Sequence, residues 1–294
     1  MTLIAGQGAE PVLPDRVAAI RNALSAGGPD WLAPKHACDL LILDDDAAKA
    51  EAAARQAIGD AAIDVLVQSG EGRRKQVFVA DLESTIIENE MLDELAEFVG
   101  LRDHVAEITR RAMNGELDFS AALKERVALL KGLPATALDE AAARIRLMPG
   151  ARALLATLRA AGVRTALVSG GFTVFVERIA AELGFDRVSA NRLDISDGHI
   201  AGTVAAPILP PESKRETLLQ MAAAAAVSLS GTVAVGDGAN DLPMLEAAGL
   251  GIAFHAKPAV AAAARWRLDH ADLTGVLYAQ GYRKDAIVDL RSGG

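Results

Sequence analysis

Side chains that can do chemistry follow three short apolar runs in this sequence. They are Asp81 after residues 77–80, Ser169-Gly170-Gly171 after residues 165–168, and the segment 236–241, Gly-Asp-Gly-Ala-Asn-Asp, after residues 232–235. An aspartate that follows a strand directly is either a helix cap or a nucleophile. A glycine pair either turns the chain or lets backbone N–H groups approach an anion. Each cluster therefore has an ordinary structural interpretation beside a chemical one.

The third cluster is the most specific of the three. It places the carboxylates of Asp237 and Asp241 and the amide of Asn240 in one turn. A hard cation such as Mg²⁺ needs a few carboxylate oxygens of this kind, completed by water and phosphate oxygens. An acidic turn with helix caps stays open as the alternative.

The apolar runs before the clusters predict parallel β-strands. They are short and lie between helical segments, such as those predicted over residues 172–183 and 241–248, which is typical of strands buried on both faces. Alternating strands and helices predict an α/β fold with a doubly wound parallel sheet. Ligands of such sheets bind beyond the carboxyl ends of the strands, so we expect the three clusters to meet there. Without a cation, the acidic groups on that edge would repel one another.

The segment between the first two of these strands, about residues 88–148, is predicted to be a helical lid. It has helical periodicity, with breaks at Gly100, Gly115 and Gly132. Further along, residues 191–204 alternate polar and apolar side chains around Asp197-Gly198, and this pair predicts a two-residue β-hairpin.

Residues 1–75 are expected to form a separate small α/β domain of unknown role. Its predicted order is strand, helix, strand, helix, strand, over residues 2–5, 15–26, 38–43, a stretch that ends near residue 58, and 63–68. Residues 69–75 are polar, charged and glycine-containing, as a linker is. The predicted domains are therefore 1–75 and 76–294.

Composition limits the class of protein. A chain of 294 residues with 51% hydrophobic and 23% charged residues is globular and large enough for about two domains. Its net charge of −9 argues against a nucleic-acid partner, and no apolar run is long enough for a membrane span. The single cysteine, Cys38, and the absence of a signal-like start predict a cytoplasmic protein. A homodimer stays open.

The clusters and their flanking segments resemble the phosphoserine phosphatases of the haloacid dehalogenase (HAD) superfamily. The first matching segment begins at Asp81 and reads Asp-Leu-Glu-Ser-Thr-Ile-Ile-Glu-Asn-Glu-Met-Leu-Asp-Glu-Leu-Ala. The others cover residues 111–127, 147–150, 169–173, 236–244, 249–253 and 255–258. The resemblance extends over about residues 77–276 and implies a HAD-like core with a helical cap, acting on the small molecule O-phosphoserine.

The resemblance also implies catalytic roles. Asp81 would attack phosphorus and form an aspartyl-phosphate, and Glu83 would serve as general acid and base. Mg²⁺ would be held by Asp81, Asp237 and the backbone carbonyl of Glu83. The groups implied to hold or orient the phosphate site are Ser169, the Gly170 amide, Lys214, Asn240 and, in support, Asp241.

In the family pattern the cap recognises the substrate. Glu90 would bind the serine ammonium group and Arg126 its carboxylate, while Met113 and Phe119 would form an apolar wall. By residue type alone, the first two would belong to a solvated helix face and the last two to a helical core.

Glu83 departs from the pattern, which has aspartate at this position. Glutamate keeps a similar intrinsic pKa, about 4.3 against about 3.9, but its carboxyl reaches about one methylene further. Misplacement on that scale can lower a rate about a hundredfold. Two alternatives therefore stay open: a related phosphomonoesterase or phosphotransferase acting on another small phosphate, and a phosphoserine-binding protein with weakened hydrolysis. A phosphoreceiver domain shares some of this chemistry but lacks the lid.

Overall fold

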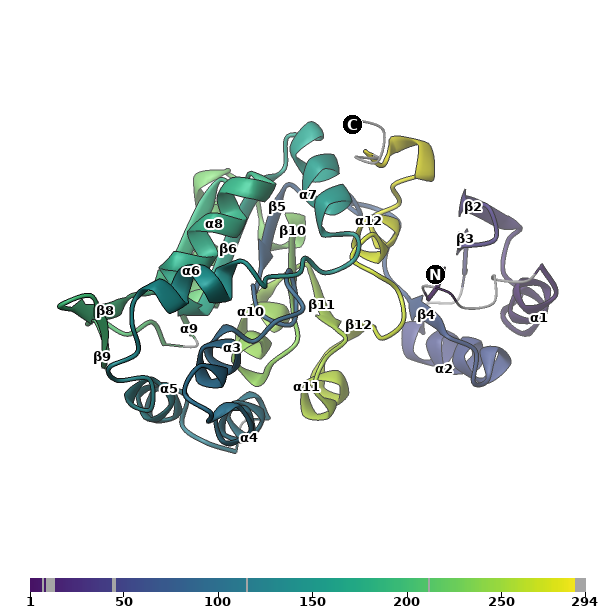
Figure 1. Ribbon diagram of the computed structural model, residues 1–294. Coiled ribbons are helices and arrows are strands. Elements are labelled where there is room, and N and C mark those ends of the chain that lie inside the picture. Colours follow the sequence, from purple (N-terminus) through teal and green to yellow (C-terminus); the bar gives the residue numbers. More distant parts are fainter. Residues whose placement is uncertain (7, 9–13, 44–45, 115, 211, 289–294) are drawn as a thin grey trace.

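The core of the protein is a six-stranded parallel sheet, seen at the centre of the computed structural model in Figure 1. The structure describes residues 1–6, 8, 14–43, 46–114, 116–210 and 212–288. The strand order is β12-β11-β10-β5-β6-β7, and every pairing is parallel. Their bounds are β5 (Val77–Ala80), β6 (Arg164–Phe172), β7 (Arg187–Asn191), β10 (Thr232–Gly236), β11 (Leu250–Phe254) and β12 (Trp266–Leu268). The predicted α/β fold with a parallel sheet is confirmed.

Helices cover both faces of this sheet because its strands are apolar on both faces. Phe78 of β5 lies in one core with residues of α7 (Ala151–Ala160), α8 (Thr173–Leu183) and α12 (Gly275–Ala279). Val77 and Val79 point to the other face. There they join residues from α9 (Glu212–Ala224), α10 (Leu242–Ala247) and α11 (Pro258–Ala263). Three short 3-10 helices lie at Leu229–Gly231, Ala239–Asp241 and Lys284–Ala286.

A helical cap follows β5, as predicted. It comprises α3 (Met91–Glu97), α4 (Arg102–Met113), α5 (Phe119–Ala128) and α6 (Thr136–Ala142). The hairpin of β8 (Leu193–Ser196) and β9 (His199–Val204) turns at Asp197-Gly198, whose φ angles of 50° and 74° suit the tight turn that the pair predicted.

The hairpin is also part of the cap, which the sequence did not indicate. The Gly132 N–H donates to the Ile200 carbonyl (2.9 Å), and the Ile200 N–H donates to the Leu133 carbonyl (2.8 Å). The segment after α5 therefore pairs with β9 from a distant part of the chain.

The N-terminal residues form a second, four-stranded sheet in the order β2-β3-β1-β4. Its elements are β1 (Thr2–Ala5), α1 (Pro14–Leu24), β2 (Pro29–Ala33), β3 (Ala37–Leu40), α2 (Ala47–Ile58) and β4 (Ile63–Leu66). Strand β2 was not predicted, because Pro29 and Asp30 disfavour a strand. The strand predicted over 38–43 ends at Leu40, and residues 44–45 lie outside the described residues.

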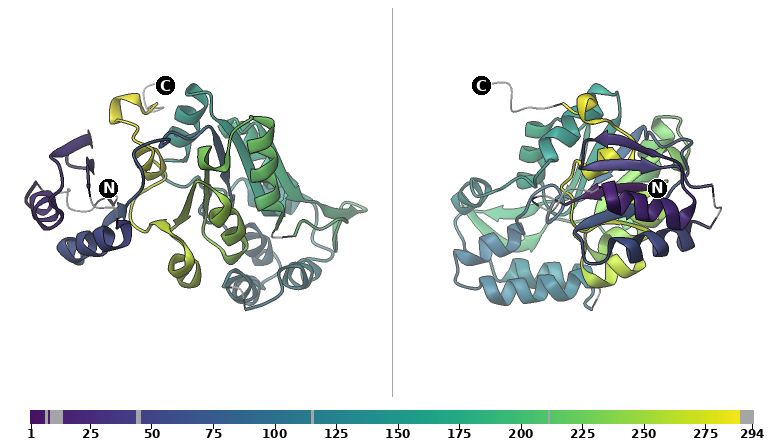
Figure 2. Two further views of the ribbon diagram at one scale, coloured as in Figure 1. Left: turned by 180° about the vertical axis from the view of Figure 1, so that it is seen from behind. Right: turned by 90° about the vertical axis from the view of Figure 1, so that its right-hand side faces the viewer.

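This N-terminal sheet lies between its own helices and the core domain. Leu3 and Ala5 of β1 pack with residues of α1 and α2, whereas Ile4 belongs to the same apolar core as Val276 and Leu277 of α12. Figure 2 shows the N-terminal sheet at one end of the molecule and the β8–β9 hairpin at the other. No helix within the described ranges is long and apolar enough to cross a membrane.

Candidate active site

Adjacent parallel strands bring the three predicted clusters to one edge of the sheet. Strand β5 pairs with β10 on one side and with β6 on the other, and the Asp81 N–H extends the ladder by donating to the Val235 carbonyl (3.0 Å). Asp81 follows β5, Asp237 follows β10, and Ser169 lies within β6. All three residues are almost fully buried.

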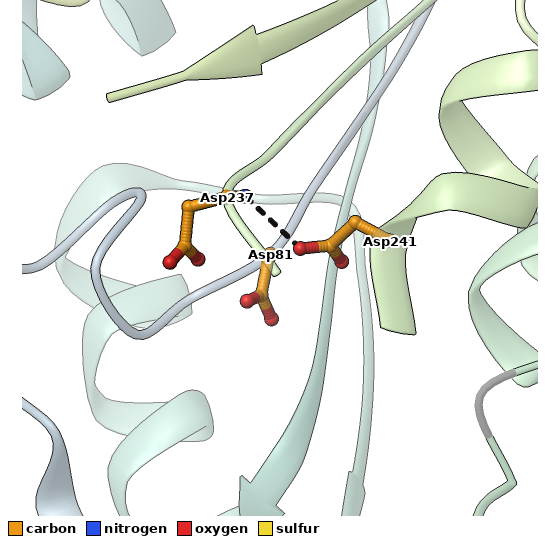
Figure 3. Close-up of side chains that lie close together, drawn as sticks. All are labelled: Asp81, Asp237 and Asp241. Atoms are coloured by element: carbon orange, nitrogen blue, oxygen red, sulfur yellow. Dashed lines mark hydrogen bonds between the residues drawn. The ribbon is translucent and has the colours of Figure 1, made fainter. Parts of the chain in front are cut away.

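Three carboxylates meet at the end of β5 and β10. Asp81, Asp237 and Asp241 each offer an oxygen within 4.8 Å of the others, and Figure 3 shows their side chains turned toward a common point. The Lys214 ammonium lies 2.8 Å from Asp81 Oδ1 and 2.5 Å from Asp241 Oδ1. Burial raises the pKa of Asp81 well above its ordinary value, and the neighbouring Lys214 opposes that rise.

Asp241 acts as a structural support for this cluster. Its Oδ1 accepts from Lys214, and its Oδ2 accepts the backbone N–H groups of Asp237 (3.0 Å) and Gly238 (2.9 Å). Both carboxylate oxygens are thereby occupied, so Asp241 fixes the turn and the lysine. This geometry agrees with the supporting role that the resemblance implied.

Asp81 and Asp237 have the chemistry of a divalent-metal site. Asp237 is 3% exposed, and burial raises its pKa while the nearby Lys257 opposes the rise. Two desolvated carboxylates on one edge suit a hard, oxygen-liganded cation, which would offset their mutual repulsion. The described residues therefore fit a divalent cation held by Asp81 and Asp237.

Lys257 is a site residue to which the sequence assigned no role. Its ammonium lies 3.1 Å from Asp237 Oδ2, and its backbone N–H donates to the Asp237 carbonyl (3.0 Å). Lys257 lies in the matching segment 255–258, but lysine is so common on protein surfaces that its residue type alone does not indicate a role.

Glu83 reaches from the loop after β5 to the first residue of α3. Its Oε1 accepts the Met91 N–H at 2.8 Å, and its Oε2 lies against Gly171, 2.8 Å from where a Cβ would stand. Burial raises the pKa of Glu83, and Arg126 partly opposes this. A raised pKa favours the protonated form, which a general acid needs.

The cap side of the site carries Glu90 and Arg126. Glu90 Oε1 accepts from the Ser84 hydroxyl at 2.7 Å, and burial raises the pKa of Glu90 well above its ordinary value, with Glu83 adding to the rise. Arg126 is 4% exposed and donates to Thr109 Oγ1 at 3.0 Å. The alternative of a solvated helix face is therefore excluded for Arg126.

Phe119 covers the end of the site at Gly170. A Cβ at Gly170 would stand 2.4 Å from the tip of the Phe119 ring, so the ring lies directly on the glycine backbone. The Gly170 carbonyl accepts from Asn191 (2.7 Å), and the Ser169 hydroxyl accepts the Gly171 N–H (2.8 Å). The side chain of Met113 lies outside the described residues.

One pocket joins these groups. Of the predicted residues, it is lined by Asp81, Glu83, Glu90, Phe119, Arg126, Gly170, Asp237 and Asn240. Buried Oδ1 of Asn240 has no hydrogen-bond partner among the described residues. Ser169, Lys214 and Asp241 do not line the pocket but contact residues that do. Gly171 of the second predicted cluster also lines it, and so do Leu92 and Leu123, which were not predicted.

Comparison with known proteins places the chain in a known family. The family model of haloacid dehalogenase-like hydrolases matches residues 78–246. The chain belongs to this family.

Relatives of the chain are named phosphoserine phosphatase. The phosphoserine phosphatase of Lactococcus lactis is 47% identical over 203 residues, which are 69% of this chain and 94% of that protein. The phosphoserine phosphatase of Streptomyces coelicolor is 46% identical over 223 residues, 76% of this chain but 54% of that protein. This chain therefore spans about half the length of the Streptomyces relative.

A solved structure agrees with these relatives. It is a phospho-aspartyl intermediate analogue of phosphoserine phosphatase, 40% identical, with a TM-score of 0.67, and the match covers 72% of this chain and 100% of that one. The resemblance read from the sequence motifs is confirmed.

Proposed function

We propose that this protein is a Mg²⁺-dependent phosphoserine phosphatase, which hydrolyses O-phospho-L-serine to L-serine and phosphate in the last step of serine biosynthesis. The observation that carries the proposal is the single cavity that joins Asp81 and Asp237 on the sheet to Glu90 and Arg126 on the cap. A phosphate group binds at one end and an amino acid at the other.

Asp81 is the nucleophile in this proposal. Lys214, 2.8 Å away, favours its ionised form against the effect of burial. The carboxylate attacks phosphorus, the bond from phosphorus to the serine oxygen breaks, and an aspartyl-phosphate forms. The analogue character of the solved relative supports this assignment.

Glu83 transfers the protons in both chemical steps of the proposed reaction. Its raised pKa favours the acid form that donates a proton to the departing serine oxygen. The resulting carboxylate then takes a proton from water, the water oxygen attacks phosphorus, and Asp81 is released with inorganic phosphate. The hydrogen bond from Met91 holds the Glu83 carboxyl in place for both steps.

The remaining groups of the site bind the metal ion and the phosphate oxygens and keep them in position. Asp81 and Asp237, with the backbone carbonyl of Glu83, would hold Mg²⁺, which supplies positive charge for the phosphoryl oxygens when bound. Ser169, the Gly170 amide, Lys214 and the side-chain N–H group of Asn240 hold the remaining oxygens. Such positioning provides most of the catalysis in phosphoryl transfer.

Substrate selection belongs to the cap. Glu90 faces the ammonium group of serine and Arg126 its carboxylate, while Phe119 excludes water above the phosphate. We further infer that residues 1–75 are a distinct domain, and that the enzyme acts in the cytoplasm, which the buried lone thiol of Cys38 supports.

Phosphate release from O-phospho-L-serine tests the proposal. We expect release by the wild type that requires Mg²⁺ and falls below detection in Asp81→Asn, which keeps the side-chain shape. Phosphoethanolamine and a sugar phosphate serve as comparison substrates. Faster release from either would favour the phosphomonoesterase alternative, and binding of phosphoserine without release would favour the binding protein.

A further inference from the structure

The guanidinium of Arg126 is held in place by hydrogen bonds to residues of the cap. Its Nε donates to the Ala122 carbonyl at 3.2 Å, and its Nη1 donates to Thr109 Oγ1 at 3.0 Å. Its Nη2 makes no hydrogen bond to any residue that the structure describes, and Arg126 lines the cavity. Nε and Nη1 are therefore held by the protein, and Nη2 is left for a ligand.

Thr109 is itself fixed by a carboxylate. It is 4% exposed on α4, and its Oγ1 lies 2.9 Å from Asp93 Oδ1 and 3.0 Å from the Val105 carbonyl. A hydroxyl has only one proton, and this oxygen already accepts from Arg126. The proton goes to the stronger acceptor, the Asp93 carboxylate. The relay Asp93–Thr109–Arg126 thus links α3, α4 and α5.

Arg126 needs such a restraint because of its surroundings. Glu83, Glu90 and Asp93 all attract its charge. A long, flexible side chain among three carboxylates would otherwise turn toward Glu83 or Glu90, where a direct ion pair would fill the cavity and remove the site for an anion. In the structure no ion pair within 4.0 Å joins Arg126 to either, among the described residues.

We propose that Thr109 and Asp93 are positioning residues that aim Arg126 at the carboxylate of the substrate, and so select phosphomonoesters of carboxylate-bearing amines. The inference rests on the proposed function and assigns a role to two residues that had none, Thr109 outside the matching segments and Asp93 within the first of them. Neither residue touches the phosphate end of the site.

Thr109→Val and Thr109→Ser test this role. Valine keeps the shape of threonine but removes the hydroxyl, whereas serine keeps the hydroxyl. For phosphoserine we expect Thr109→Val to raise KM about tenfold with kcat changed less than about threefold, and Thr109→Ser to stay within about twofold of the wild type. Inhibition by inorganic phosphate, which has no carboxylate, should be unchanged in both variants.

Asp93→Asn provides a second variant, because its amide oxygen can still accept from Thr109 without the negative charge. We expect a smaller rise in KM than in Thr109→Val, with unchanged phosphate inhibition. An unchanged KM in Thr109→Val, or equal losses of phosphoserine and phosphate affinity, would overturn the inference. Failure of the wild type to release phosphate from phosphoserine would instead overturn the proposed function, and this inference with it.

Discussion

Glu83 has one methylene more than the aspartate of the family pattern, and its carboxyl contacts the cap. The longer side chain reaches the Met91 N–H of α3 at 2.8 Å, so the acid is anchored to the cap as well as to the strand loop. The sequence raised the question of whether glutamate overshoots the site unless the loop or rotamer adjusts. In the structure its carboxyl lines the same cavity as Asp81.

Replacement of Glu83 by glutamine should separate proton transfer from binding. The amide oxygen can still accept from Met91, but the side chain can no longer donate or take up the catalytic proton. We expect Glu83→Gln to lower kcat for phosphoserine about a hundredfold or more, with little change in KM. Steady-state kinetics give both values, and Glu88→Gln, at an exposed site, is the control. A variant as active as the wild type would refute general acid/base work at this position.

At the scale of elements, α5 of the cap contacts the end of β6 in the core sheet. Phe119 at the start of α5 rests on Gly170, where an added Cβ would stand 2.4 Å from the ring tip. The clash involves the far end of a side chain, so the ring can move without disturbing the sheet. We infer that glycine at 170 serves closure more than stability.

Gly170→Ala should therefore impair the closed site and leave the fold intact. We expect kcat/KM for phosphoserine to fall about tenfold, with little change in thermal midpoint. In the double variant with Phe119→Ala, the loss in kcat/KM, expressed as a free energy, should be smaller than the sum of the two single losses, because removal of the ring removes the clash. Gly70→Ala is the matched control, since nothing lies within 4 Å of a Cβ there. Strict additivity of the two changes would contradict this account.

At the scale of the whole molecule, the buried acids make metal-free stability depend on pH. Burial is the main cause that raises the pKa values of Asp81, Glu83, Glu90 and Asp237. Between the ordinary and the raised values the folded state binds more protons than the unfolded state. Stability is therefore fully present below the ordinary pKa values of 3.8 and 4.5 and is lost as pH rises through the raised ones.

The metal-free protein should accordingly lose stability as pH rises above the ordinary pKa values of 3.8 and 4.5 and through the raised ones. Mg²⁺ should reduce that loss, because a bound cation stabilises the ionised carboxylates. Denaturant unfolding with a chelator and with excess Mg²⁺, across this range, measures both effects. Identical pH dependence under the two conditions would count against a cation at Asp81 and Asp237.

The attachment of the N-terminal sheet also belongs to the whole molecule. The buried Asp64 carboxylate of β4 accepts the backbone N–H groups of Asp269 (2.7 Å), His270 (3.2 Å) and Ala271 (2.8 Å), which follow β12. It joins the two sheets through backbone N–H groups for which no other hydrogen bond to a described residue is seen. Removal of the carboxylate would leave three donors unpaired.

Asp64→Ala should lower the free energy of unfolding by about 1–3 kcal/mol. The loss should affect the interface, so we expect a broader denaturant transition as the N-terminal sheet separates from the core before it unfolds. Asp60→Ala, at an exposed turn, should leave both midpoint and width unchanged. A midpoint for Asp64→Ala equal to that of the wild type would show that the anchor contributes nothing.

The sequence by itself determined the strands of the core and the residues that follow them. Residues 77–80, 165–168 and 232–235 form strands with two mainly apolar faces. Such strands are typical of a parallel sheet that helices cover on both faces. Because parallel strands end on one edge, the meeting of Asp81, Ser169 and Asp237 followed from the same pattern. The family resemblance then identified Glu90 and Arg126.

Only the tertiary structure decided the contacts between distant segments. Strand β2 contains Pro29 and Asp30 and exists because β3 pairs with it, and the β8–β9 hairpin joins the cap through hydrogen bonds to residues far earlier in the chain. Lys257 and Thr109 are ordinary residue types whose importance comes from one carboxylate or one guanidinium beside them. Periodicity reports which face of an element is buried, whereas a hydrogen bond between elements depends on how those faces pack, and that is settled only when the whole chain folds.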